Sequence, residues 1–251
     1  MLKKRIIPIL LFRDYSLVKG INFKSDRIVG GVIENIILFD KREVDEIIFL
    51  DIDSTLKESK INYSQVNEIS KNCFVPLTIG GGVRNLNQIN KLLKSGADKI
   101  AINSALFNDP IFVKNAIREF GSQCIVASID YKKLENKNIV HINSGKFNTN
   151  QELLDFCCKV EGYGVGEILL TSIDKDGMMN GYDIPVIKDI KKKINIPLIA
   201  SGGAGSCEDF FLAISECQAD AVAASSLFYF KNITPKDVKI FLNSKGVNVR
   251  N

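Results

Sequence analysis

Short runs rich in β-branched and other hydrophobic residues recur along the chain. Segments with helical spacing of hydrophobic residues lie between them, as at residues 87–96, 109–121 and 184–193. Short apolar runs are typical of strands that are buried on both faces of a parallel sheet. Because parallel strands need a crossover connection, usually a helix, the pattern predicts eight strands that alternate with helices. The predicted strands lie at residues 5–11, 46–52, 75–81, 98–103, 123–130, 166–172, 196–203 and 220–225.

The two halves of the chain resemble each other in sequence. The run that begins at Glu46 returns at Glu167, and the run that begins at Pro76 returns at Pro197 with the same offset. At 251 residues, eight strand–helix units could form an open doubly wound sheet or a closed barrel. A repeat of four units per half favours the α/β fold called a (β/α)8 TIM barrel, since an open sheet gives no reason for the duplication. We expect a single barrel domain over residues 1–251, with half-barrels of approximately 1–122 and 123–251.

Composition excludes several classes of function. A hydrophobic content of 45% and a charged content of 25% are ordinary for a soluble globular protein, and a net charge of +4 without basic clusters does not indicate nucleic-acid binding. The apolar N-terminal run is interrupted by Pro8 and followed by Arg13 and Asp14, so it predicts a buried strand rather than a signal peptide. No segment has the length of a membrane span. We expect a cytoplasmic protein that binds neither nucleic acid nor membranes.

The cysteines and the histidine bear on the possible chemistry. The six cysteines show no CxxC spacing, and the only histidine, His141, lies in a polar segment that we predict to be a loop. This combination gives no zinc site, and we expect neither a metal nor a cofactor. Nucleophilic mechanisms that need a histidine would depend on His141 alone. Acid–base chemistry therefore falls to carboxylates.

Glycine clusters follow equivalent strands in the two halves, at residues 80–82 and 202–205. Glycine between a strand and a helix lets backbone N–H groups approach an anion closely, although it also serves tight turns. The next strand of each half ends in small polar residues, Asn103-Ser104 and Ser225-Ser226, whose side chains suit phosphate oxygens. TIM barrels commonly bind phosphate with the loops after strands 7 and 8, where the second cluster lies. The pattern predicts two phosphate sites and a ligand with a phosphate at each end.

A series of motifs resembles one family over nearly the whole chain. They read KRIIP, GGGVR, GADK, INSA, FGSQ, SGK, GEILLTSIDKDG, IASGGAG and GVNVR, in this order. The series is similar to the cyclase subunit of imidazole glycerol phosphate synthase, the HisF family. The resemblance implies ring closure with ammonia and a bis-phosphorylated ribulosyl nucleotide. It also implies a heterodimer in which a HisH-type glutaminase docks on the bottom of the barrel and ammonia travels along the barrel axis.

The resemblance also assigns residues to the site. It implies that Asp130 is the general base, that Lys19 is the loop lysine, and that Asp51 is a further catalytic position. Even without the family, a carboxylate at the C-terminal end of a barrel strand suggests catalysis, with structural capping as the alternative. The residues implied to contact phosphate or substrate are Gly82, Asn103, Ser104, Thr171, Asp176, Gly177, Gly203, Ala224 and Ser225.

One position departs from the family pattern. The family motif in the first strand reads approximately C-L-D-V-K-D-G, and its first aspartate is the general acid. This chain has Leu11 at that position, within the sequence ILLFRDY. Leucine cannot donate a proton, and loss of a positioned general acid typically costs ~10²–10⁴-fold in rate. Asp14 matches another family residue and is therefore not a displaced copy of the acid.

Four charged residues open predicted strands 1, 2, 4 and 6, and all four match the family's ring of charges at the bottom of the barrel. In a barrel, such residues could form a gate for ammonia or an ion cluster that only stabilises the fold. The ring residues are Arg5, Glu46, Lys99 and Glu167, and Asp98 and Gln123 match positions that contact the glutaminase.

These observations support three hypotheses. The first is a HisF-like subunit of a glutamine-dependent amidotransferase that serves surface-sugar amidination, with a sugar amidotransferase as a further partner. The second is the histidine-pathway cyclase with an altered acid. The third is a non-catalytic barrel that senses a phosphorylated ligand and activates its glutaminase. Retention of the ring beside loss of the acid at Leu11 favours the first hypothesis, because it keeps ammonia delivery without the usual ring closure.

Overall fold

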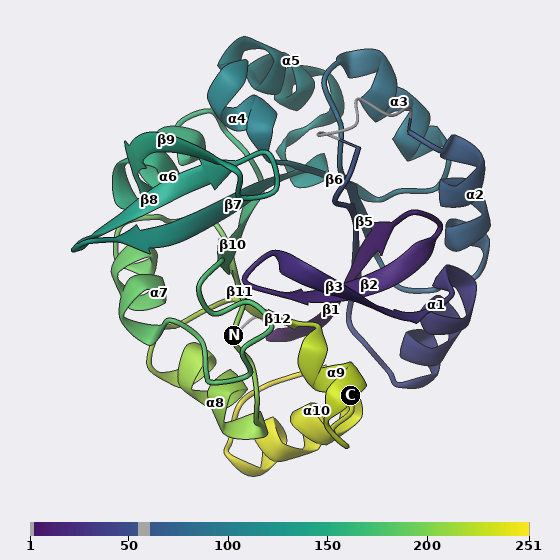
Figure 1. Cartoon of the computed structure of the whole chain (residues 1–251), viewed down its shortest axis with the longest axis vertical. Coiled ribbons are helices and arrows are strands. Elements are labelled where there is room, and N and C mark those ends of the chain that lie inside the picture. Colours follow the sequence, from purple (N-terminus) through teal and green to yellow (C-terminus); the bar gives the residue numbers. More distant parts are fainter. Residues whose placement is uncertain (1–2, 55–60, 251) are drawn as a thin grey trace.

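Eight parallel strands close into a barrel in this computed structural model, which describes residues 3–54 and 61–250 (Figure 1). The parallel pairing of β1 with β12 completes the closure. All eight predicted strands are confirmed, and the largest difference is that β7 continues past its predicted end. In order around the barrel, the strands are β1 (Arg5–Arg13), β4 (Ile47–Asp51), β5 (Leu77–Gly80), β6 (Lys99–Ile102), β7 (Ile125–Leu134), β10 (Glu167–Ser172), β11 (Leu198–Ser201) and β12 (Ala221–Ala224).

Helices form the outer layer, and several of them begin at polar caps. The Asp109 side chain accepts a hydrogen bond from the Phe112 backbone, and Pro110 occupies the first turn of the next helix. Thr234 and Asp237 form a capping box at the start of the last helix. The helices are α1 (Val32–Lys41), α2 (Tyr63–Lys71), α3 (Leu86–Lys94), α4 (Ser104–Asn108), α5 (Pro110–Phe120), α6 (Leu153–Glu161), α7 (Ile184–Lys191), α8 (Cys207–Ser215), α9 (Ser226–Phe230) and α10 (Pro235–Ser244), with a 3-10 turn, η1, at Ser122–Cys124.

Two hairpins lie over the end of the barrel where the strands finish (Figure 1). β2 (Ser16–Ile21) and β3 (Lys24–Gly30) follow β1, while β8 (Lys137–Ile142) and β9 (Phe147–Glu152) follow β7. The sequence pattern did not predict them. Since β1 and β7 are the first barrel strands of the two halves, the hairpins extend the half-barrel repeat beyond the barrel wall.

The barrel interior is apolar between its two ends. Alternate residues of each strand point inward, as the pleat requires, and the others pack against the helices. Ile7, Ile48, Val126 and Leu169 belong to this inner core, and each is at most 1% exposed. Polar side chains therefore gather at the two ends of the axis, where the strands begin and where they finish.

A buried ion pair ties α10 to the start of the barrel. Lys239 Nζ lies 2.8 Å from Asp45 Oδ1, and both residues are buried. Lys239 also donates to the Glu43 carbonyl, while Asp45 Oδ2 accepts a hydrogen bond of 2.7 Å from the Ile6 backbone N–H. Because both charges are removed from water, each needs the other, and removal of one partner leaves an uncompensated buried charge.

We predict that Lys239→Met lowers the free energy of unfolding by about 3 kcal/mol, since Asp45 then keeps its charge without its cation. Lys236→Met is the matched control: Lys236, in the same helix, pairs with Glu43 at 2.8 Å, but both side chains are about half exposed. That change should cost less than about 1 kcal/mol. Urea unfolding of both variants measures the difference. Equal losses would contradict a structural role for the buried pair.

Candidate active site

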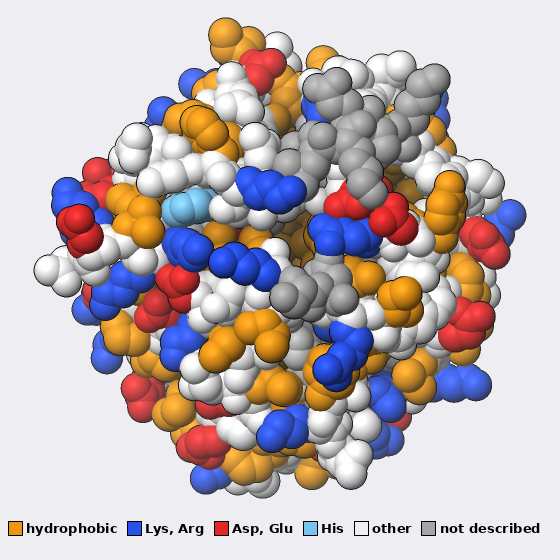
Figure 2. Space-filling view, in the orientation of Figure 1, with side chains coloured by type: hydrophobic (Ala, Val, Ile, Leu, Met, Phe, Trp, Pro, Cys, Tyr) orange, Lys and Arg blue, Asp and Glu red, His pale blue; other side chains and the backbone are white. Residues whose placement is uncertain are grey.

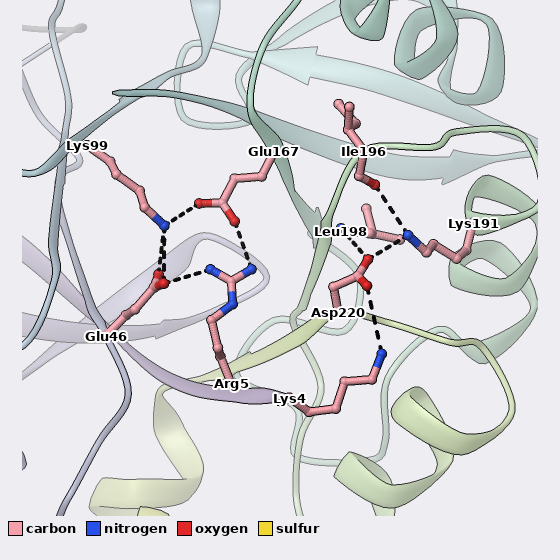
Figure 3. A network of polar contacts seen from close by, with 9 residues as sticks. All are labelled: Lys4, Arg5, Glu46, Lys99, Glu167, Lys191, Ile196, Leu198 and Asp220. Carbon is pink, nitrogen blue, oxygen red and sulfur yellow. Dashed lines mark hydrogen bonds and ion pairs between the residues drawn. The ribbon is translucent and has the colours of Figure 1, made fainter. Parts of the chain in front are cut away.

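Four charged side chains form a closed ring at the end of the barrel where the strands begin (Figure 3). Arg5 contacts Glu46 at 2.7 Å and Glu167 at 2.9 Å. Lys99 contacts the same two carboxylates, at 3.1 Å and 2.7 Å. Each cation therefore joins both anions, and the charges alternate around the opening. The structure brings together the four residues that the sequence predicted as a ring.

The ring carboxylates are largely removed from water. The side chains of Glu46 and Glu167 are 6% and 8% exposed. Burial alone would raise the pKa of Glu167, but the charges of Arg5 and Lys99 outweigh it and hold this pKa below its ordinary value. The Glu167 carboxyl therefore stays ionised near neutral pH. The ion pairs keep the opening closed by contact between side chains, as Figure 3 shows.

Two further predicted residues lie exposed beside the ring. The Asp98 carboxylate accepts a hydrogen bond of 2.8 Å from the Leu77 backbone N–H, and the Gln123 side chain lies in η1. Asp220, the repeat counterpart of Asp98, accepts from the Leu198 backbone and pairs with Lys191 at 2.5 Å (Figure 3). The two aspartates thus share a role in the fold, and Asp98 presents its carboxylate on the exposed face around the ring.

A cavity opens at the other end of the barrel, under the hairpins. Figure 2 shows a hollow near the centre of this face, with hydrophobic side chains inside and Lys and Arg side chains around it. The cavity collects side chains from strands that lie far apart in sequence. The predicted residues that line it are Leu11, Asp51, Asn103, Asp130, Thr171, Asp176, Gly177, Gly203, Ala224 and Ser225.

Asp130 faces the cavity from the point where β7 leaves the barrel wall and continues into its hairpin. Its Oδ2 accepts a hydrogen bond of 3.0 Å from Asn103 Nδ2. Burial raises the pKa of Asp130 to about 7 and the charge of Asp176 adds to this rise, while hydrogen bonds from Asn103 and Thr171 oppose it. A carboxylate with a pKa near neutrality can take up and release protons under physiological conditions.

Lys19 reaches the second glycine cluster from β2. Its ammonium donates to the Ile9 carbonyl at 2.8 Å and contacts Ser225 Oγ, which also contacts the Ile9 carbonyl. The ammonium lies 5.3 Å from the centre of the Tyr229 ring. Burial lowers the pKa of Lys19 to about 7, and the charge of Asp176 opposes this. Lys19 is thus placed beside the predicted phosphate site rather than beside Asp130.

Asp51 has a structural role in its loop. Its Oδ1 accepts hydrogen bonds from the backbone N–H groups of Asp53 and Ser54, at 3.0 Å and 2.9 Å. Such a side-chain cap fixes the turn after β4. The side chain still lines the cavity, so the prediction of a catalytic position for Asp51 stays a prediction.

Leu11 makes one part of the cavity apolar. It pairs with Leu50 of β4 and with Val18 of β2, and it packs with Leu50 against the inner core. It lines the same cavity as Asp130. The position that the resemblance assigns to the general acid therefore contributes only hydrocarbon to the cavity.

The two glycine clusters lie at separate places on this face. Gly82, Asn103 and Ser104 line a second hollow together with Arg84 and Asn143. Ser104 Oγ donates to Asn143 Oδ1 at 3.0 Å, a contact from the β8–β9 hairpin that the sequence did not indicate. The second cluster, at residues 202–205, lines the main cavity. At Gly203, a Cβ would lie 2.2 Å from the Gly181 carbonyl, and φ is +114°, so this position requires glycine.

The tip of the β2–β3 hairpin rests on the loop after β10. The Asn22 backbone N–H donates to the Asp176 carbonyl at 2.9 Å. Gly177 lies directly under the hairpin, since a Cβ there would be 2.1 Å from the Gly20 carbonyl. Phe23 of the same tip lines the cavity. The hairpin thus covers part of the site. The sequence did not predict this cover, because both contacts join residues that lie far apart in the chain.

The prediction for His141 was wrong. It lies in β8 rather than in a loop, directly opposite Asp130 in the strand pairing, and it is 6% exposed. Its Nδ1 lies 3.0 Å from the Ile139 carbonyl. The segment pairs with β7 and β9, and the sequence pattern did not indicate this pairing. Neither hollow on this face is lined by His141.

No group of three or more His, Cys, Asp or Glu side chains within residues 3–54 and 61–250 could hold a metal ion. In the same part of the chain, no helix is both long enough and apolar enough to cross a membrane.

Comparison with known proteins identifies the family. The family model described as "Histidine biosynthesis protein" matches residues 5–234. Imidazole glycerol phosphate synthase subunit HisF of Hydrogenobaculum sp. (strain Y04AAS1) is 46% identical over 251 residues and covers 100% of both chains. The HisF subunits of Natranaerobius thermophilus and Dehalococcoides mccartyi are each 43% identical over 250 residues, which cover 100% of this chain and 100% and 99% of theirs. The chain therefore belongs to the HisF family of imidazole glycerol phosphate synthase subunits.

Proposed function

We propose that this chain is the synthase subunit of a glutamine-dependent enzyme, in which a HisH-type glutaminase releases ammonia at the ring of Arg5, Glu46, Lys99 and Glu167. The ammonia then crosses the barrel and reacts with a phosphorylated substrate beside Asp130. The observation that carries the proposal is the placement of a closed ion ring and a proton-accepting carboxylate at opposite ends of one apolar barrel.

The interior between the two ends suits a small neutral molecule. Strand β1 covers ~20 Å between Arg5 and Leu11 at ~3.3 Å per residue. The inward side chains along it, Ile7 and Ile9, are apolar and buried. Transfer of an ion into such surroundings costs far more than transfer of a neutral molecule. Ammonia should therefore pass where ammonium does not, once the ring side chains separate.

The substrate end supports a ligand with two phosphates. One glycine cluster lies with Asn103 and Ser104, and the other lies with Ser225 and Lys19. Between them, Asp130 lies within reach of Asn103. A ligand that spans the two clusters would place its middle near Asp130. With a pKa of about 7, Asp130 would act as a base increasingly well as the pH rises through neutrality.

Leu11 supports a specialised role for this subunit. Its hydrocarbon side chain removes the family's proton donor while the ring and both glycine clusters remain. We therefore propose a cytoplasmic complex that serves surface-sugar amidination, with a sugar amidotransferase as its further partner. The second candidate is the histidine-pathway cyclase, which is favoured by identity of 46% over the full length of a HisF subunit. A ligand sensor that only activates the glutaminase is favoured less, because Asp130 has the pKa of a working base.

We predict that Lys99→Met uncouples glutamine hydrolysis from ammonia transfer, because the ring loses the cation that contacts both Glu46 and Glu167. In the glutaminase complex, we expect the ratio of product formed to glutamine hydrolysed to fall several-fold, while turnover with added ammonium is retained. Lys192→Met is the control: its ion pair with Asp189 is exposed, at 3.3 Å. A normal ratio in Lys99→Met would reduce the ring to a stability feature.

We also predict that two phosphate ions bind on the face that carries the hairpins, one at each glycine cluster. The physical reason is that backbone N–H groups and small hydroxyl side chains converge there from both halves. A crystal structure in the presence of phosphate measures the positions. Binding at one cluster only, or at other places, would contradict the two-phosphate ligand.

A further inference from the structure

We propose that Asp176 is the general acid of this chain and supplies the proton that Leu11 cannot. The inference rests on the proposed function, since it assumes that ammonia reacts in the cavity beside Asp130. Both carboxyl groups line this cavity together with Leu11. Asp130 reaches it from β7, and Asp176 reaches it from the loop after β10. The cavity therefore holds a second carboxyl group that could take the opposite proton-transfer role.

The other ionisable groups around the cavity already have structural partners. The Asp51 carboxylate accepts two backbone hydrogen bonds, from Asp53 and Ser54, and fixes its own loop. The Arg13 guanidinium pairs with Asp53 at 2.9 Å. A side chain that fixes the backbone is poorly suited to exchange a proton in each cycle. These contacts make Asp51 and Arg13 weak candidates for the acid.

Lys19 is also a poor candidate. Its ammonium donates to the Ile9 carbonyl, contacts Ser225 and lies near the Tyr229 ring. These contacts hold the ammonium at the second glycine cluster, where a phosphate would neutralise it. Among the carboxyl groups that line the cavity in the described part of the chain, Asp176 and Asp130 remain.

The position of Asp176 is fixed by contacts of its backbone. The Asp176 N–H donates to the Ser172 carbonyl at 3.0 Å, and its carbonyl accepts from Asn22 at the hairpin tip. The adjacent Gly177 admits the hairpin at a distance that no side chain would allow. The hairpin thus holds Asp176 over the cavity and shields it from bulk water.

The electrostatic setting of Asp176 suits a proton donor. Burial raises the pKa of Asp176 to about 6, and the nearby charge of Lys19 limits the rise. The charge of Lys19 from β2 acts on Asp176, and the charge of Asp176 in turn raises the pKa of Asp130 from β7. A bound phosphate would add negative charge and pair with Lys19. Both effects favour the neutral form of the Asp176 carboxyl. Two carboxyl groups with different environments can divide acid and base roles between them.

The proton balance of the step is simple. When ammonia adds to a carbonyl carbon of the substrate, a C–N bond forms and the C–O π bond opens, while the neutral Asp176 carboxyl gives a proton to the oxygen and the Asp130 carboxylate takes one from the nitrogen. After proton exchange with solvent has reset both groups, a second pair of transfers protonates the hydroxyl and removes another proton from the nitrogen, so that the remaining C–O bond breaks, water leaves and a C=N bond forms. Each pair of transfers ends with the proton moved from Asp176 to Asp130. Proton exchange with solvent then restores both groups without any further reactant.

The test combines substitutions at Asp176 and Leu11. The assay is turnover of the family's ribulosyl nucleotide with ammonium salt as the nitrogen source. We expect Asp176→Asn to lose on the order of 100-fold in kcat with a small change in KM, because proton donation acts in the transition state. Leu11→Asp should restore most of that loss in the double variant, since it places a carboxyl group on the same cavity. Asp174→Asn, in the same loop, is the control for loop stability, because Asp174 accepts from the Lys133 backbone.

Each other outcome overturns the inference. If Asp176→Asn mainly raises KM, or if Leu11→Asp does not restore kcat, Asp176 binds substrate and is no acid. If the wild-type protein is inactive but Leu11→Asp is active, the cavity has its proposed function and Asp176 does not replace the missing acid. If neither is active with ammonium, the histidine-pathway candidate falls together with the inference.

Discussion

Removal of charge from water inside a narrow apolar barrel is the constraint on which both ends of this protein depend. At the ring, the buried carboxylate of Glu167 contacts two cations, and its pKa lies below its ordinary value. In the cavity, the buried carboxyl of Asp130 accepts hydrogen bonds from the neutral side chains of Asn103 and Thr171, and its pKa rises to about 7. The same burial therefore accompanies an ionised carboxylate in the ring at one end and a carboxyl group with a pKa near neutrality at the other.

The half-barrel repeat explains how one glycine cluster from each half comes to lie on the same face of the barrel. Equivalent strands end at equivalent heights, so the glycine clusters at 80–82 and 202–205 both lie on the face of the hairpins. The hairpins, which also repeat, complete the two sites differently. Asn143 of β8–β9 contacts Ser104 at the first site, while Lys19 of β2–β3 contacts Ser225 at the second. The two halves therefore differ in the segments added above the barrel.

The sequence allowed accurate prediction of the barrel wall, because buried parallel strands leave short apolar runs that are independent of tertiary context. The ring of charges was predicted from charged residues at the starts of those strands and from their match to the family. The hairpins were missed although Asn143-Ser144-Gly145 is a turn signal between β8 and β9, because their strands are short and pair only above the barrel. Two properties of the site could not be predicted from the sequence, because they arise only when the chain is folded. The position of Lys19 depends on Ser225, which lies 206 residues later, and the pKa of Asp130 depends on burial by several elements.

The central claim is that ammonia travels inside the barrel from the charged ring to the cavity. The most direct measurement is an isotope competition in the complex with a HisH-type glutaminase, with amide-¹⁵N glutamine and an excess of unlabelled ammonium in solution. An internal path predicts that the product keeps the ¹⁵N label, because ammonia from glutamine does not mix with the solvent. Dilution of the label to the isotope ratio of the bulk ammonium would contradict the internal path and the proposed role of the ring.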